Sequence, residues 1–131
     1  MSNTSIKHVY MKDLHFELKV WLNELKFFKE ELGFFDKRLM DVAQKNTDKE
    51  MLRELEHFQN QFIRQNEVID ETRHDVKQAE NTLEQFAHEH PIASDHVYFS
   101  DHVNLRENMN TFRDIYIDLK KEYLRFLAKW L

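Results

Sequence analysis

The fold is decided by the stretch at residues 14–42, which reads LHFELKVWLNELKFFKEELGFFDKRLMDV. Its apolar residues recur at alternating steps of three and four, which is the 3.5-residue period of helices that pack along one seam. The seam positions are Leu14, Leu18, Trp21, Leu25, Phe28, Leu32, Phe35, Leu39 and Val42. We therefore predict one long helix here that buries a single face.

The same period returns twice further along the chain. The second seam consists of Met51, Leu55, Phe58, Phe62, Gln65, Ile69, Thr72, Val76, Ala79, Leu83 and Phe86. The third consists of His102, Leu105, Met109, Phe112, Tyr116, Leu119, Tyr123, Phe126 and Trp130. Short connections make consecutive helices antiparallel. The sequence therefore predicts an all-α protein, an up-down-up antiparallel three-helix bundle of long helices with coiled-coil-like heptad packing.

Local signals mark the ends of these helices. Thr47-Asp48-Lys49-Glu50 has the pattern of a capping box, Pro91 disfavours helical geometry at the residue before it, and Ser94 suits a helix N-cap. Gly33 lies on the outer face of the first helix, and a break there would produce four helices. We expect one helix through it and a single domain over residues 1–131. The predicted helices span about 5–45, 48–89 and 95–131.

Composition narrows the class of protein. The 19 basic residues are interleaved with 24 acidic ones and the net charge is -5, so the chain has no basic surface for nucleic acid. No apolar run approaches the roughly 18 residues that a membrane span needs. The absence of cysteine excludes disulfides and thiolate zinc sites. We expect a soluble, cytoplasmic protein without a nucleic-acid or membrane partner.

Two layers of the predicted core contain polar groups. Counting along the antiparallel helices places Trp21, Thr72 and Tyr116 in one layer, and Phe28, Gln65 and Tyr123 in the other. Their indole, hydroxyl and amide groups could satisfy one another. Such groups could also line a small-ligand pocket. Polar seam residues more commonly fix the alignment of helices, and we favour that role.

The sequence offers no recognisable catalytic group. It has no glycine-rich phosphate loop, no cysteine nucleophile, and no serine or threonine with an evident histidine and acid constellation. The segment from Glu54 to His57 matches the Glu-x-x-His string of di-metal helical bundles, but the heptad pattern points His57 outward. We therefore expect neither an enzyme nor a resident cofactor.

Histidines concentrate where the second helix is expected to end and the third to begin. Four of the eight lie there, at His88, His90, His96 and His102. Neutral imidazoles bind zinc, nickel and copper, so these four are candidate metal ligands, although their spacing matches no rigid template. We favour half-buried histidines at the end of a bundle. Protonating all eight would change the net charge from -5 to +3, which makes a pH response a separate possibility.

Charged residues flank the first and third seams at heptad spacing. They are Glu17, Glu24 and Glu31 on the first helix and Arg106, Arg113 and Lys120 on the third. The layer count brings Glu17 near Arg113 and Glu24 near Lys120, which indicates that these two edges face each other. Exposed ion pairs contribute little stability, but they report how helices are oriented.

A second set of apolar residues lies just outside these charged edges. Its members are Phe16, Val20, Phe27 and Phe34 on the first helix and Ile117, Leu124 and Leu131 on the third. They either widen the contact between the two helices or seat another helix. Counting along the chain also places the end of the third helix, at Leu131, level with His57 of the second. That would leave an uncovered apolar tip on the first two helices, at Leu39, Val42, Met51 and Leu55.

These features predict a non-enzymatic interaction or scaffold module. We expect it to form a homodimer, or to bind a partner helix, through an outer apolar groove between the first and third helices. Two-fold dimers are the commonest closed assembly, and a second copy could cover both the groove and the tip. The alternative is a metal-binding or pH-responsive protein that uses the histidine-rich end from His88 to His102.

Overall fold

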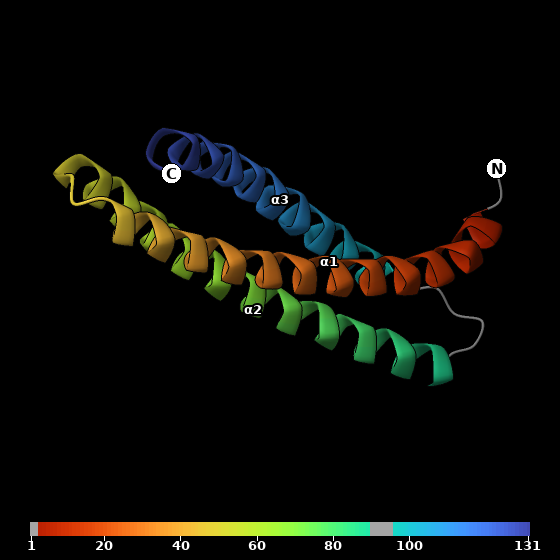
Figure 1. Ribbon diagram of the computed structural model, residues 1–131. Helices are drawn as coiled ribbons and strands as arrows, with labels where there is room; N and C mark the ends of the chain where they lie inside the picture. The colour runs from red at the N-terminus through yellow and green to blue at the C-terminus, as the bar shows by residue number, and fades with distance from the viewer. Residues whose placement is uncertain (1–2, 90–95) are drawn as a thin grey trace.

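The computed structural model describes residues 3–89 and 96–131. It contains three helices, α1 (Asn3–Lys45), α2 (Lys49–Glu89) and α3 (His96–Trp130). They run up, down and up past one another, and no strand occurs in these two ranges (Figure 1). The prediction of an all-α three-helix bundle is confirmed, and the helix ends lie within about two residues of those expected.

Helix α1 is continuous through Gly33. The residue is exposed, and a Cβ atom added there would meet no other atom within 4 Å. Gly33 therefore serves no close approach of another element, and it costs the helix about 1 kcal/mol relative to alanine. The alternative of four helices with a break at Gly33 is wrong, because the buried seam on the opposite face continues past it.

Helix α2 is capped at its start by Asp48. Its Oδ1 atom accepts the backbone N–H groups of Glu50 and Met51 at 2.8 and 3.2 Å. The predicted capping box gave this role to Thr47, one residue too early. A carboxylate both accepts these hydrogen bonds and places a negative charge at the positive end of the helix, which explains why Asp48 takes the position.

The seam positions form the core, as predicted. One cluster of buried apolar side chains joins all three helices. Its most deeply buried members, with none of their surface exposed, are Leu25, Leu32, Val42, Met51, Ile69, Val76, Met109 and Tyr123. Phe28, Phe35, Ala79 and Leu105 are partly buried against this cluster. The heptad pattern therefore identified which face of each helix points inward.

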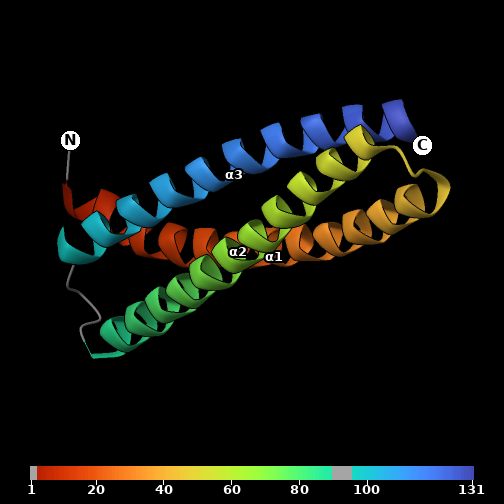
Figure 2. The same ribbon diagram turned by 90° about the vertical axis from the view of Figure 1, so that its left-hand side faces the viewer.

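Helix α2 is displaced by about one helical turn from its predicted alignment. Continued along the helices, the predicted layers pair Phe58 with Trp130 and with Phe35. Phe58 instead packs on Phe126, with ring centroids 5.1 Å apart. On the other side, Phe35 packs on Phe62 at 5.8 Å instead of on Phe58. Helix α2 crosses α1 obliquely (Figure 2), so equal steps along the two helices do not stay level. Long side chains also lean toward the N-terminus of their own helix.

The apolar tip that was expected to be uncovered is closed by the end of α3. Trp130 Nε1 donates to Glu54 Oε2 at 2.5 Å, and Asn46 Nδ2 donates to the Trp130 backbone carbonyl at 2.8 Å. The tip residues are at most 6% exposed, namely Leu39, Val42, Met51 and Leu55. The displacement carries α3 further toward the connection between α1 and α2, so the tip gives no reason for a partner.

The two predicted polar layers do not form. The Tyr116 hydroxyl donates to Glu31 Oε1 at 2.7 Å, and the Tyr123 hydroxyl donates to the backbone carbonyl of Phe35 at 3.0 Å. Burial raises the pKa of both phenols, so both remain protonated donors. Their partners are on α1, whereas the prediction placed them beside Thr72 and Gln65 of α2.

The same displacement leaves the side-chain carbonyl of Gln65 without a partner. Only 5% of the residue is exposed, and its Oε1 atom is buried without a hydrogen bond. Thr72, the other polar seam residue of α2, is partly exposed and keeps access to water. A buried carbonyl that has lost its water costs about 1–3 kcal/mol, so Gln65 is a weak point of the core.

We predict that Gln65→Leu raises the free energy of unfolding by about 1 kcal/mol, because it removes the unsatisfied carbonyl and adds an apolar contact. Urea unfolding followed by far-UV circular dichroism measures this change. The exposed Gln44 on α1 supplies the control, because Gln44→Leu should change stability by less than about 0.5 kcal/mol. A Gln65→Leu variant that is less stable than the wild type would contradict the prediction.

Candidate functional site

A ladder of ion pairs joins α1 to α3. Glu17 binds Arg106, Glu24 binds Arg113 and Glu31 binds Lys120, with nitrogen–oxygen distances of 2.7, 2.7 and 3.0 Å. Each pair is 89 positions apart in the chain. The prediction that these two edges face each other is confirmed. The predicted partners were wrong by one heptad, because the displacements of α2 against its two neighbours add together.

The middle rung has the best geometry. Both carboxylate oxygens of Glu24 accept from Arg113, at 2.7 Å each. The hydrogen bonds to Glu24 raise the pKa of the Arg113 guanidinium, and burial only partly opposes them. The side chains of this pair are about a quarter exposed, at 27% for Arg113 and 26% for Glu24. Such pairs contribute about 1 kcal/mol or less, but their planar fit holds two helices at one offset.

Two glutamates of the ladder also bind polar seam residues of α3. Glu17 contacts His102 and Glu31 contacts Tyr116, and both pairs are 85 positions apart. Glu31 accepts from Lys120 and Tyr116 with different oxygens, whereas Glu17 accepts from Arg106 with both oxygens and also contacts His102 through Oε1. The polar character of His102 and Tyr116 indicated that each needs a polar partner. Because the predicted helix offset was wrong, the sequence did not identify Glu17 and Glu31 as these partners.

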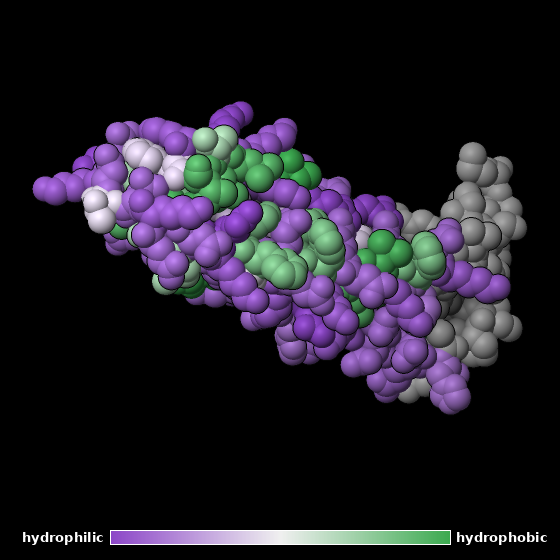
Figure 3. Space-filling model, in the orientation of Figure 1, coloured by the Kyte–Doolittle hydropathy of each residue, from purple (hydrophilic) through white to green (hydrophobic). Residues whose placement is uncertain are grey.

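Apolar side chains on the outer edges of α1 and α3 stay exposed. We call them the outer stripe, and they are Phe16, Val20, Phe27, Phe34, Ile117, Leu124 and Leu131. Their exposed fractions range from 43% to 70%. Figure 3 shows apolar surface over α1 and α3 in patches that hydrophilic residues separate. The side chains of the outer stripe therefore remain available for contact, and they do not simply widen the packing of α1 on α3.

The two rows of the outer stripe meet at a different offset from the predicted one. The prediction paired residues 97 positions apart, such as Phe27 with Leu124. The ladder offset of 89 instead brings Phe27 level with Ile117, and Phe34 level with Leu124. Two apolar rungs therefore lie beside the ladder, while Phe16 and Val20 extend the row on α1 alone.

His102 is the buried histidine of the histidine-rich end. It is 3% exposed, its ring stacks on Trp21 with centroids 4.9 Å apart, and its Nε2 atom lies 2.5 Å from Glu17 Oε1. An ionised carboxylate can only accept, so Nε2 carries the proton. Trp21 and Tyr116, predicted to share a layer, are thus joined to different partners.

The pKa values of Glu17 and His102 are both lowered, although burial acts on the two groups in opposite directions. Burial raises the pKa of the Glu17 carboxyl, but hydrogen bonds from Arg106 and His102 outweigh it, and the net shift is downward. Burial lowers the pKa of the His102 imidazole, and the hydrogen bond to Glu17 offsets this only in part. At neutral pH the pair therefore consists of an ionised Glu17 and a neutral His102.

Among the described residues, no other candidate metal ligand joins His102. His88 is exposed at the end of α2, His90 lies outside the described residues, and so does the side chain of His96. In the part of the chain that the structure describes, no group of three or more His, Asp or Glu residues could hold a metal ion. The Glu-x-x-His string on α2 is not a ligand pair there either, since Glu54 accepts from Trp130 and His57 is exposed.

No family model matches this chain, and no curated protein or solved structure matches it either. Among the described helices, none combines the length and the apolar character that crossing a membrane requires. The class that the fold defines is an all-α three-helix bundle. Its function has to be inferred from the outer stripe and the histidine-rich end.

We predict that stability falls as the pH drops below 6.5, the ordinary pKa of histidine. The unfolded chain then binds a proton at this residue before the folded chain does, so the free energy of unfolding decreases until the lowered pKa of His102 is reached. A second loss follows below 4.5, when the unfolded chain protonates Glu17 first. Urea unfolding at a series of pH values between 7 and 4 measures both.

The control is an exposed histidine of α2. His102→Gln keeps a donor for Glu17 but does not titrate, so its stability should depend less on pH between 7 and 5.5 than that of the wild type. His74→Gln, at an exposed position, should keep the wild-type slope. Equal slopes for His102→Gln and the wild type would show that this histidine does not couple folding to pH.

Proposed function

We propose that the protein is a non-enzymatic, cytoplasmic interaction module that self-associates through the outer stripe. The observation that carries the proposal is the exposure of seven large apolar side chains in two adjacent rows on α1 and α3. Single exposed apolar residues are common, but rows of aromatic and aliphatic side chains on one face are typical of contact surfaces.

The dimensions of the outer stripe suit a helix of a second copy. From Phe16 to Phe34 the row on α1 extends about 27 Å, at 1.5 Å per residue. Phe16, Phe27 and Phe34 are 70%, 56% and 64% exposed, and aromatic side chains dominate the energetics of contact surfaces. A two-fold axis perpendicular to α1 would place the same row of the second copy antiparallel to the first.

The charges beside the outer stripe favour a close approach. The three acidic residues of the ladder are each paired with a basic residue of α3, so this edge carries no block of one sign. A second copy would therefore meet little electrostatic repulsion there, even though the chain has a net charge of -5. The paired charges would form a polar rim around an apolar contact.

A pH-responsive role for the histidine-rich end is a second candidate. The observation that favours it is the contact between the buried His102 and the partly exposed Glu17, which changes charge only when the pH falls. Protonation of a buried imidazole beside Arg106 would loosen the end of the bundle. The pH series described above tests this role, because a histidine with the same pKa in the folded and unfolded chains would leave the slope unchanged.

We expect sedimentation velocity to show that the wild-type protein associates as its concentration rises. Phe27→Asp combined with Leu124→Asp should weaken this association by roughly 100-fold or more, because each buried contact would then contain an unpaired carboxylate. Far-UV circular dichroism should remain unchanged, since both residues are exposed on single helices.

The matched control lies on α2. Ile63 is 59% exposed and is not part of the outer stripe, so Ile63→Asp should associate like the wild type. A wild-type protein that stays monomeric at every concentration would refute self-association. A double variant that associates as strongly as the wild type would show that the contact uses another surface.

A further inference from the structure

Four exposed charged residues lie beside the outer stripe on α3. Glu107, Asp114 and Lys121 follow one another at intervals of seven, and Arg125 comes one turn after Lys121, so all four lie on one side of the helix. Asp114 and Lys121 lie three and four residues from Ile117, which places this side next to the outer stripe. We call the four residues the α3 charge row. Its first half is acidic and its second half is basic.

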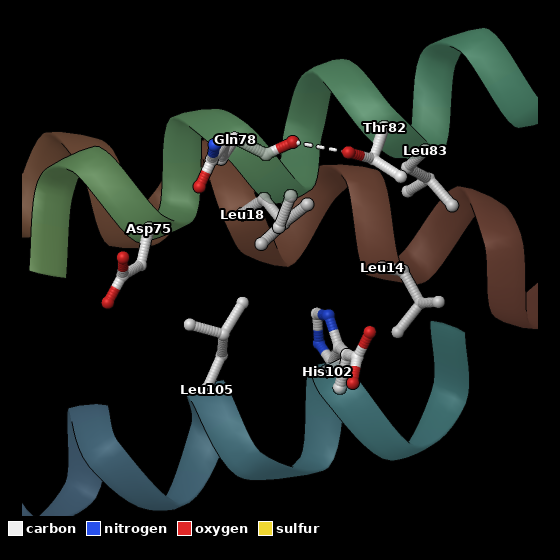
Figure 4. A pocket seen from close by; sticks show the side chains of 10 residues that line it. Leu14, Leu18, Asp75, Gln78, Thr82, Leu83, His102 and Leu105 are labelled. Carbon is white, nitrogen blue, oxygen red and sulfur yellow. Dashed lines mark hydrogen bonds between the residues drawn. The ribbon is translucent and has the colours of Figure 1, made fainter. Parts of the chain in front are cut away.

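The opposite side of α3 faces the inside of the bundle. His102 and Leu105 line a cleft there, together with residues of α1 and α2. Figure 4 shows the side chain of Leu105 directed toward Leu18 of α1. Glu107 follows Leu105 by two residues, so its side chain points to the other side of the helix. The α3 charge row is therefore turned away from the core, where a second molecule can reach it.

The outer stripe of α1 and the α3 charge row share one centre. On α1, Val20 and Phe34 each lie seven residues from Phe27. The three rungs of the ladder join residues 89 positions apart, so Phe27 lies level with residue 116 of α3. The first and last members of the α3 charge row each lie nine residues from residue 116, and the two inner members lie on either side of it. A half turn about an axis at this level therefore exchanges the two halves of both patterns.

We propose that a second copy of the chain packs antiparallel on this face, with the two-fold axis at the level of Phe27. The acidic half of each α3 charge row then faces the basic half of the other. Glu107 lies opposite Arg125 and Asp114 lies opposite Lys121, and the symmetry makes each pair occur twice. This inference rests on the self-association proposed above, and it adds the direction of the second copy and the polar contacts that select it.

The apolar residues of α1 favour the same direction. In the antiparallel dimer, Val20 packs on Phe34 of the second copy. In a parallel two-fold dimer α1 would instead face α3 of the second copy, where the row of Ile117 and Leu124 continues with Asn110 at the level of Val20. Asn110 is exposed and its side-chain oxygen accepts from Arg113 at 2.7 Å. The parallel dimer would therefore place an apolar side chain against a polar amide and lose this contact.

Crosslinking tests the direction of the second copy, and a chain without cysteine suits it. Glu107→Cys and Arg125→Cys are treated with a short bismaleimide at a concentration where sedimentation shows association. In the antiparallel dimer the two copies of residue 107 are about 27 Å apart along the helices, at 1.5 Å per residue, whereas residue 107 lies beside residue 125 of the other copy. We expect an equal mixture of the two variants to form crosslinked dimers, and neither variant to form them alone.

Charge reversal tests the polar contacts. Lys121→Glu with Arg125→Glu makes the α3 charge row acidic throughout and should weaken association about tenfold in sedimentation velocity. Arg53→Glu with Lys77→Glu, at exposed positions of α2, changes the net charge by the same amount. This control should weaken association by less than about threefold, because its charges lie away from the contact.

A variant of opposite charge supplies the rescue. Glu107→Lys with Asp114→Lys makes the row basic throughout, and its mixture with the acidic variant should associate at least as tightly as the wild type. Crosslinks within one cysteine variant, no crosslinks in their mixture, or wild-type association of the acidic variant would each overturn the antiparallel contact and leave self-association standing. A wild type that stays monomeric would instead refute the proposed function, and this inference with it.

Discussion

Each helix of this protein has one apolar seam, and in a bundle of three that seam has to face two neighbours at once. Among the described residues, twenty buried apolar side chains meet this requirement. Burying a large apolar side chain stabilises a fold by about 1.5–3 kcal/mol, whereas an exposed ion pair contributes about 1 kcal/mol or less. Seam packing therefore positions the helices, and the ladder between Glu17, Glu24, Glu31 and their α3 partners records the offset that packing selects.

The polar residues of the seams differ in whether they have a hydrogen-bond partner once they are buried. Tyr116, Tyr123 and His102 each reach α1, where a carboxylate or a backbone carbonyl accepts their hydrogen. Gln65 has no equivalent partner for its carbonyl oxygen. The contrast arises because α3 lies along the acidic edge of α1, which supplies acceptors for Tyr116 and His102, whereas no described group donates to the Gln65 carbonyl. Polar seam residues on α3 are therefore compatible with stability, and the one on α2 opposes it.

Packing of the seams leaves the apolar side chains of the outer stripe exposed. The outer stripe remains exposed because its residues lie beyond the charged edges, where α1 and α3 no longer contact each other. The ion pairs of the ladder border the outer stripe, so no block of one charge sign lies beside it.

The sequence by itself determined the number of helices, their ends to within about two residues, and which face of each is buried. These follow from local pattern, because heptad spacing and the residues at helix ends act within a few turns. Which helix edges face each other was also readable, since opposite charges repeat at the same period on α1 and α3.

Only the tertiary structure decided the offset between helices, and with it every specific partner. The actual offset differs from the expected one by about one turn at each hairpin. Glu17 therefore pairs with Arg106 instead of Arg113, Trp130 closes the tip, and the side-chain carbonyl of Gln65 has no hydrogen bond. Periodic seams look alike after a shift of one heptad, so counting along the chain cannot distinguish these alignments. Oblique crossing of α2 over α1 and the lean of long side chains select one of them, and both are properties of the assembled helices.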